Sequence, residues 1–249
     1  MAYSSRPYAS RYAPSNRFPT GLKWLLIVNT AIFVIAYFLS TAGMDSVFRN
    51  FLLVPSQVVT TGAIWQLVTY MFLHSGFTHI LWNMLTLWMF GVALERLWRT
   101  ARFLRFYFAC GIGAGFTVII VNYLAGDPNV GTLGSSGAIY GILMAYAVLF
   151  PDRIILFGFL IPIKVKYFVM IMGAIVFMTS FHSKGSGISD AAHLGGLVVA
   201  FFILRGKWLQ NALRTPIVNG WKEYKLRRAK KKFEVYLREQ GSKDDRWVN

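Results

Sequence analysis

The sequence has little charge and a single cysteine. Only 14% of its 249 residues are charged, against about a quarter in an average soluble domain, and 55% are apolar. With Cys110 alone, the chain can form no internal disulfide and no metal cluster built on several cysteines. Acidic residues are also few: 26 lysines and arginines against 10 aspartates and glutamates give a net charge of +16. This composition excludes a disordered chain and argues against an ordinary soluble domain.

Long stretches without charge take the place of charged segments. They cover residues 24–44, 50–94, 106–126 and 128–151, and about 20 apolar residues are enough to cross a bilayer as a helix. Because lipid offers the backbone no hydrogen-bond partner, we expect the crossing segments to be helical. The sequence therefore predicts an all-α, polytopic membrane protein with six spanning helices, near residues 22–42, 79–98, 103–125, 136–150, 166–182 and 190–205.

Two basic tails flank the predicted membrane domain of residues 21–205. Residues 1–20 are rich in serine, proline, arginine and tyrosine, which predicts a flexible tail rather than a cleaved signal peptide. Residues 206–249 are predicted to be a basic, partly helical tail. It is either solvated or attracted to an anionic lipid leaflet. Because no nucleic-acid reader motif accompanies these charges, we expect no nucleic-acid partner.

Two connections between the predicted spans are unusual. Residues 43–78 are too many for a tight turn and include apolar stretches, so we expect a long first loop that lies on the membrane. Residues 152–164 are apolar but interrupted by Pro162 and followed by Lys166, and we place them at the interface because a lysine at depth is costly.

The basic residues predict the orientation. With six spans, 24 of the 26 lysines and arginines fall on the side of both termini, and only Arg49 and Lys184 fall on the other. Positively charged loops stay in the cytoplasm, so both termini should be cytoplasmic. We therefore expect a multi-pass protein of the cytoplasmic (inner) membrane of a cell, of bacterial type.

The fourth predicted span opens with a small-residue motif around a serine, Gly134-x-Ser136-Gly137. A hydroxyl at a helix start lies beside open backbone N–H groups, which favour developing negative charge. The alternative is purely structural, because Gly137 and Gly141 could form a smooth face that lets two helices approach closely.

The sixth predicted span carries an imidazole in apolar surroundings. His193, Gly196 and Ala200 share one helical face, and an intramembrane histidine is a functional candidate because burying it without a partner is expensive. If this face packs on the fourth span, His193 comes within reach of Ser136. A serine hydroxyl needs such a base, since it is a poor nucleophile at its own pKa.

Polar residues also begin the second predicted span. His79 and Asn83 are four residues apart and so share a helix face, and His74 precedes them. Two hydrogen-bond donors for a tetrahedral oxyanion account best for this pair. A metal site on His74 and His79 lacks an acidic or thiolate ligand nearby, so we expect no metal. Polar side chains that simply bond neighbouring helices remain a third interpretation.

Taken together, the three motifs resemble the rhomboid intramembrane serine proteases. They are His79-x-x-x-Asn83, Gly134-x-Ser136-Gly137 and Ala192-His193-x-Gly195-Gly196, and the similarity covers about residues 20–205.

The resemblance implies a role for each of these side chains. Ser136 would be the nucleophile and His193 its general base, a dyad without a carboxylate. An oxyanion hole would be formed by His79, Asn83 and the amide of Ser136. Tyr140 would pack on His193 and shape the substrate cleft, and His74 would give polar support.

Three positions bear on how closely the chain follows the family. The Trp-Arg pair often found in the first loop is Trp65-Gln66 here, which puts loop anchoring in doubt, and Ala200 replaces a frequent glycine. Asp190, three residues before His193, could complete a triad, but its place in the first turn of the helix favours a capping acid.

The predicted function is cleavage of single-span membrane proteins near their extracytoplasmic ends, within the lipid bilayer and without a cofactor. One alternative is a non-catalytic rhomboid-like protein that binds or escorts membrane clients, which predicts loss of the serine or the histidine. A second alternative is a channel or transporter, in which polar side chains should occur at several depths of the membrane. In this sequence the polar side chains of the spans cluster near one membrane face. The sequence predicts no oligomeric state.

Overall fold

The structure is a computed structural model that describes residues 18–44, 46–157, 160–179 and 187–206. The predicted tails, residues 1–20 and 206–249, lie outside these ranges apart from residues 18–20 and 206. The chain divides into two units, Met1–Phe201 and Phe202–Asn249. Apart from residues 202–206, the fold and the site described below belong to the first unit.

A helix occupies each of the six ranges in which the sequence predicts a span. These helices are α1 (Thr20–Thr41), α5 (Phe77–Trp98), α6 (Thr100–Ala125), α7 (Ser136–Leu149), α8 (Val165–Thr179) and α9 (Gly187–Arg205). Three of them, α1, α5 and α6, are long and apolar enough to cross a membrane, and α7 and α8 are shorter apolar helices. The helical membrane architecture is therefore present, while a crossing by all six stays a prediction.

Large apolar side chains point away from the protein on several helices. Phe38 of α1 is 65% exposed, Ile120 of α6 59% and Met170 of α8 67%. Extended apolar surface of this kind is unfavourable in water and favourable against acyl chains. The outer surfaces of these helices are therefore suited to lipid.

A two-stranded hairpin corrects the all-α prediction. Strands β1 (Ile154–Phe157) and β2 (Ile161–Lys164) pair antiparallel, with Ile154 opposite Lys164 and Leu156 opposite Pro162. Branched residues favour extended backbone, and Pro162 can sit in this two-stranded sheet because both of its strands are edges. The hairpin occupies the connection that we placed at the interface, next to the start of α8.

The long first loop is built from short helices. They are α2 (Ser46–Arg49), α3 (Pro55–Thr60), α4 (Gln66–Thr69) and the 3₁₀ helix η1 (Tyr70–Phe72). A backbone bridge between Leu53 and Thr132, with N–O distances of 3.0 and 2.9 Å, ties the loop to the segment before α7. The loop is therefore held directly beside the motif that contains Ser136.

Gln66 anchors the loop without a charge. Its side chain is 1% exposed and accepts a hydrogen bond from the Val54 N–H at 2.9 Å. Its amide nitrogen donates to Gln57 Oε1 at 2.7 Å and to the Asn50 carbonyl at 3.3 Å. The doubt about anchoring is thus resolved, because a buried neutral amide makes the loop contacts and needs no counter-ion.

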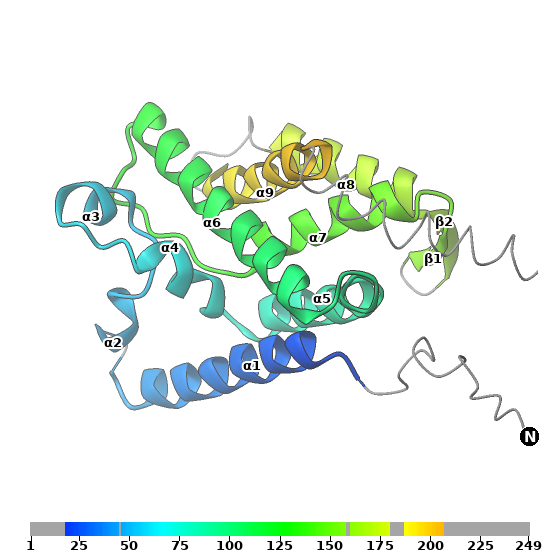
Figure 1. Cartoon of the computed structure of the whole chain (residues 1–249). Helices are drawn as coiled ribbons and strands as arrows, with labels where there is room; N and C mark the ends of the chain where they lie inside the picture. The colour runs from blue at the N-terminus through cyan, green and yellow to red at the C-terminus, as the bar shows by residue number, and fades with distance from the viewer. Residues whose placement is uncertain (1–17, 45, 158–159, 180–186, 207–249) are drawn as a thin grey trace, which may run out of the picture. The chain divides into compact units, whose positions relative to one another are not determined.

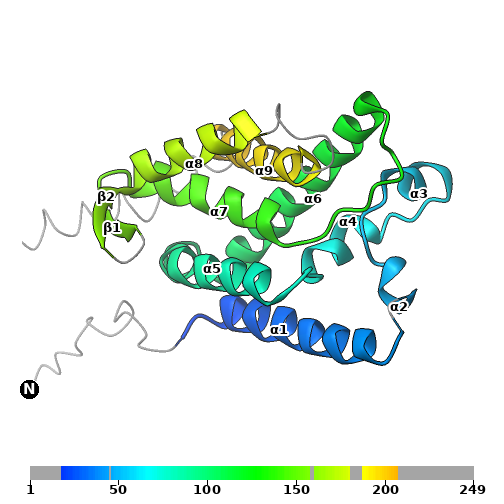
Figure 2. The same ribbon diagram turned by 180° about the vertical axis from the view of Figure 1, so that it is seen from behind.

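Glycines let α7 pack closely against two other helices. A Cβ on Gly137 would come within 2.6 Å of Ala114 Cβ in α6, and one on Gly141 would meet Cys110 Cβ at 2.6 Å. On the other side, a Cβ on Gly196 of α9 would overlap the carbonyl of Gly137. Both views show α7 lying between α5 and α8 (Figures 1 and 2). The N-terminal end of α7, where Ser136 lies, is therefore enclosed by several elements.

Candidate active site

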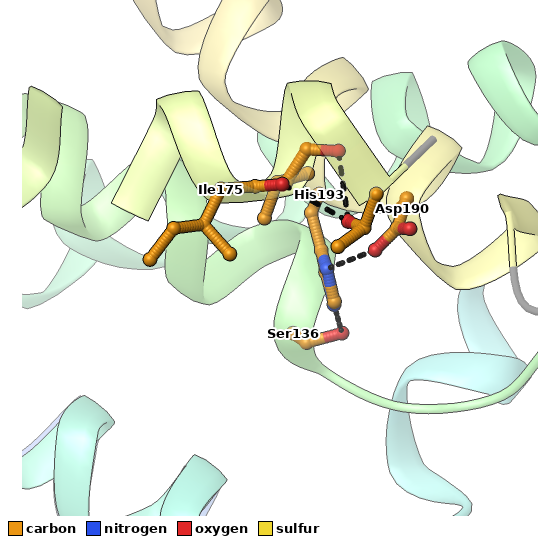
Figure 3. Close-up of polar contacts among 6 residues, drawn as sticks. Ser136, Ile175, Asp190 and His193 are labelled. Atoms are coloured by element: carbon orange, nitrogen blue, oxygen red, sulfur yellow. Dashed lines mark hydrogen bonds and ion pairs between the residues drawn. The ribbon is translucent and has the colours of Figure 1, made fainter. Parts of the chain in front are cut away.

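Ser136 and His193 come together where α7 and α9 pack. Ser136 is the first residue of α7, and its Oγ lies 2.8 Å from His193 Nε2, although 57 residues separate the two in sequence. Figure 3 shows the hydroxyl on one edge of the imidazole ring. The glycine contact between Gly137 and Gly196 brings the two helix backbones close enough for this hydrogen bond.

Two side chains hold the imidazole of His193 from other directions. The ring of Tyr140, one turn after Ser136, stacks on it with centroids 4.4 Å apart and planes 20° apart. Asp190 in the first turn of α9 places Oδ1 3.8 Å from His193 Nδ1, on the far side from Ser136 (Figure 3). That separation is too long for a hydrogen bond, and among the described residues His193 Nδ1 has no hydrogen-bond partner.

A cavity of about 330 Å³ opens at this serine and histidine. Its walls come from α5, α7, α8 and α9, which contribute His79, Asn83, Tyr140, Phe168 and Met172 among others. Of the predicted site residues, Ser136, His193, His79, Asn83 and Tyr140 therefore face one space. The cavity combines these polar groups with apolar side chains such as Phe168 and Met172, as in a site that must hold an apolar segment and a reacting group.

His79 and Asn83 are placed to donate hydrogen bonds into this cavity. Among the described residues, the buried Nδ2 of Asn83 has no hydrogen-bond partner. His79 Nδ1 receives the Ser75 backbone N–H at 3.4 Å and lies 3.1 Å from Ser75 Oγ. Because an N–H donates to Nδ1, the ring proton is assigned to Nε2, which then acts as a donor.

Gly134 leaves room for the His79 ring. Its φ of +118° lies in a region that other residues rarely adopt, and a Cβ there would come within 2.9 Å of His79 Nε2 and 3.7 Å of Ser136 Oγ. A side chain at this position would therefore push into the space between the histidine and the serine. The first glycine of the motif is explained by this close approach.

The other two predicted site residues lie outside the cavity. His74 sits behind the site, with Nε2 3.3 Å from Ser135 Oγ and its ring 5.1 Å from that of His79. Burial and the neighbouring His79 lower the pKa of His74 to about 4, so it is neutral at pH 7. Trp65 is 51% exposed and donates Nε1 to the Asn50 carbonyl at 3.0 Å, which makes it part of the loop.

Four residues that shape this region are absent from the sequence-based prediction of the site. Ser75 and Ser135 hold the two histidines, and Phe168 and Met172 of α8 form the cavity wall. A serine four residues before His79 was a usable signal, since such spacing permits a local side-chain bond. The two α8 residues sit in a uniformly apolar helix, and only the fold identifies them.

The described part of the chain contains no group of three histidine, cysteine or acidic side chains that could hold a metal ion. Within it, His74 and His79 therefore have no third ligand of these types. The arrangement instead combines a hydroxyl, an imidazole and two hydrogen-bond donors around one cavity, which suits nucleophilic attack on a carbonyl.

Comparisons with known proteins identify the family to which the chain belongs. Residues 61–208 match the family model described as Rhomboid domain. The chain is 33% identical over 147 residues to the Bacillus subtilis (strain 168) protein named "Putative rhomboid protease YdcA". The aligned residues cover 58% of this chain and 68% of the Bacillus subtilis protein. The chain is 32% identical over 149 residues to the rhomboid protease GluP of the same organism, 59% of this chain but 27% of GluP. Rhomboid protease AarA of Providencia stuartii is 27% identical over 222 residues, which cover 82% of this chain and 78% of AarA. The chain therefore belongs to the rhomboid family.

Proposed function

We propose that this chain is an intramembrane serine endopeptidase that uses Ser136 and His193 as a catalytic dyad. The observation that carries the proposal is the 2.8 Å separation between Ser136 Oγ and His193 Nε2 at a cavity that also holds His79 and Asn83. Its relatives carry the name rhomboid protease, which supports the same reaction class.

The first chemical step is attack on a peptide carbonyl. His193 Nε2 accepts the proton of Ser136 Oγ as the oxygen bonds to the carbonyl carbon, giving a tetrahedral oxyanion. Collapse of this intermediate breaks the C–N bond, and the leaving amine takes the proton from His193. A water molecule, deprotonated by His193, then hydrolyses the acyl ester and regenerates the serine.

Three donors stabilise the oxyanion in this scheme. They are His79 Nε2–H, the Asn83 amide and the backbone N–H of Ser136, which belongs to the first turn of α7, where N–H groups have no intrahelical acceptor. Removing one such donor typically lowers kcat by about 10²–10³-fold. Tyr140 keeps the imidazole plane fixed while the proton moves in both directions.

The membrane arrangement is part of the proposal. All six helices cross the bilayer, both termini are cytoplasmic, and the cavity opens toward the extracytoplasmic side, where water can reach Ser136. A substrate helix has its carbonyl groups bonded internally, so it must unwind locally before it can be attacked. The substrates are therefore single-span membrane proteins with helix-weakening residues, such as glycine or proline, near their outer ends.

Cleavage by the purified full chain in proteoliposomes tests the proposal. A single-span substrate with a fluorescent tag should be cut near its outer end by wild-type protein, whereas Ser136→Ala and His193→Ala should abolish cleavage and keep the helical circular dichroism signal. Ser135→Ala is the matched control: it removes a neighbouring hydroxyl that contacts His74 but not the dyad, and should therefore still cleave the substrate. Specific cleavage by both dyad variants would refute the assignment, and a wild type that binds the substrate but never cuts it would favour a non-catalytic client-binding protein.

A further inference from the structure

A second and larger cavity, of about 720 Å³, lies between α1, α2 and the segment before α5. One wall is a face of α1 with Ile32, Phe33, Ala36 and Tyr37, and the opposite wall is the segment Leu73–Phe77. It shares no lining residue with the cavity at Ser136 and His193. It is therefore a separate space, which we call the α1 groove.

The lining of the α1 groove is mainly apolar, and it includes the polar side chains of Ser40 and Arg49. Ile32 and Phe33 line its apolar part, and Ser40, near the C-terminal end of the helix, lines it together with Arg49 of α2. Figure 2 shows α2 just beyond that end of α1. Ile32 and Ser40 are eight residues apart, or about 12 Å along the axis. One hydrocarbon leaflet is about 15 Å thick, so the groove matches the length of a partly inserted acyl chain.

Arg49 supplies a charge that a lipid headgroup would need. It is exposed, and within the described part of the chain no carboxylate forms an ion pair with it. In the six-span arrangement it is one of only two basic residues on the extracytoplasmic side. A guanidinium binds a phosphate through two parallel hydrogen bonds, and it does so more strongly where acyl chains exclude water.

We propose that the α1 groove binds one glycerophospholipid, with its phosphate on Arg49 and one acyl chain along Ile32, Phe33 and Ala36. The charge at one end and the apolar depth below it fit both parts of this ligand. The inference requires the helices to lie in a bilayer but not that Ser136 is a nucleophile. Lipid binding and peptide cleavage can therefore fail independently.

The bound lipid would also support the candidate active site from behind. Ser75, which lines the groove, contacts His79 Nδ1 at 3.1 Å, and His74, which also lines it, contacts Ser135 Oγ at 3.3 Å. A lipid packed against residues 73–77 restricts the motion of the segment that orients the His79 donor. The groove is thus a site through which membrane composition regulates turnover.

Native mass spectrometry of the delipidated full chain in detergent tests the binding. The binding of palmitoyl-oleoyl phosphatidylglycerol is compared with the binding of two other ligands. These are the diacylglycerol with the same acyl chains, which lacks the phosphate, and inorganic phosphate, which lacks the acyl chains. We expect one phosphatidylglycerol to bind about tenfold more tightly than the diacylglycerol, and Arg49→Gln to remove that preference. A preference retained in Arg49→Gln, or equal competition by inorganic phosphate alone, would overturn the proposal.

A pair of tryptophan substitutions tests the acyl part of the site. Ala36→Trp fills the α1 groove, whereas Ala31→Trp, on another face of the same helix, adds the same bulk outside it. Lipid binding should be lost in the first and kept in the second, with helical signal and thermal unfolding compared in both. Equal effects of the two variants, or a second protein copy in place of the lipid, would contradict the proposal.

Hydrogen exchange reports the effect on the segment before α5. Added phosphatidylglycerol should slow amide exchange in residues 73–77 of wild-type protein and of Ser136→Ala, and should leave it unchanged in Arg49→Gln. Because Ser136→Ala has no nucleophile, protection in that variant separates the lipid site from the catalytic proposal. Unchanged exchange in wild-type protein with lipid bound would contradict the support of His79 by the groove.

Discussion

Gly196 is the point at which α9 packs directly on the backbone of α7. A methyl group added there would lie inside van der Waals contact of the Gly137 carbonyl oxygen, 2.8 Å from the carbonyl carbon and 3.3 Å from the Cα. These are backbone atoms of a helix, so no rotation of a side chain can make space. Gly196→Ala should therefore push α9 away from α7.

The displacement can be related to activity through the dyad. Restoring an ordinary contact requires the helices to separate by more than about 1 Å, which stretches the Ser136 Oγ–His193 Nε2 separation from 2.8 Å to beyond hydrogen-bond length. Misplacing a catalytic group by about 1 Å can lower the rate about 10²-fold, and overpacking a close helix contact costs about 1–3 kcal/mol of stability. We expect both effects in Gly196→Ala.

Gly173→Ala in α8 is the matched control. A Cβ there would lie 3.5 Å from Leu197 Cδ1, an ordinary contact with another residue of α9. Initial rates of substrate cleavage are measured per folded protein in proteoliposomes, with thermal unfolding followed in parallel. Gly173→Ala should keep at least half of the wild-type rate. Wild-type rate and stability in Gly196→Ala would refute the reasoning, because the close backbone approach would then not position the dyad.

Three further predictions concern residues around the site and at the start of α1. Ser75→Ala removes the hydroxyl that contacts His79 Nδ1, so kcat should fall about three- to tenfold with KM unchanged; a change in KM alone would argue against a role in orienting the oxyanion donor. Glu95 is 3% exposed, and its carboxylate accepts hydrogen bonds from the backbone N–H groups of Gly21 and Leu22 and from the Thr100 hydroxyl. Glu95→Gln should therefore lower the free energy of unfolding by about 1–3 kcal/mol in a denaturant titration. An unchanged free energy of unfolding would contradict this capping of α1. The pKa of His74 is about 4 in the folded protein and about 6.5 in the unfolded chain. Between these two pH values only the unfolded state binds the proton, so the free energy of unfolding should fall by up to about 3 kcal/mol as the pH drops from 6.5 to 4. His74→Gln should flatten that part of the thermal-stability profile, and an unchanged profile would show that another group titrates.

Hydrophobicity was sufficient to locate the helices of the membrane domain. Each predicted range contains a helix, and α1 begins two residues before the predicted residue 22 while α9 begins three before residue 190. The hairpin does not follow from composition, because residues 152–164 are mainly apolar and the pairing of Ile154–Phe157 with Ile161–Lys164 leaves no mark on composition. Strand pairing depends on a partner segment, which composition within one window does not include.

The residues of the candidate site could be predicted from the sequence where they are chemically unusual for a membrane helix. Ser136 and His193 stand out because apolar spans rarely carry such groups, and the glycines beside them indicate close packing. Ser75 and Gln66 are not chemically unusual, since polar residues are ordinary in loops. Their roles depend on contacts that form only when the loop folds back on itself, as with Gln66 and Val54.

Covalent labelling by a fluorophosphonate tests most directly whether Ser136 is a nucleophile activated by His193. The purified full chain is treated with the probe in mild detergent, and the intact mass and the modified peptide are determined. We predict a single adduct on Ser136, absent in Ser136→Ala and strongly reduced in His193→Ala, with Ser135→Ala labelled like wild-type protein. An adduct that persists in both Ser136→Ala and His193→Ala, or a folded wild type that never reacts, would contradict the dyad.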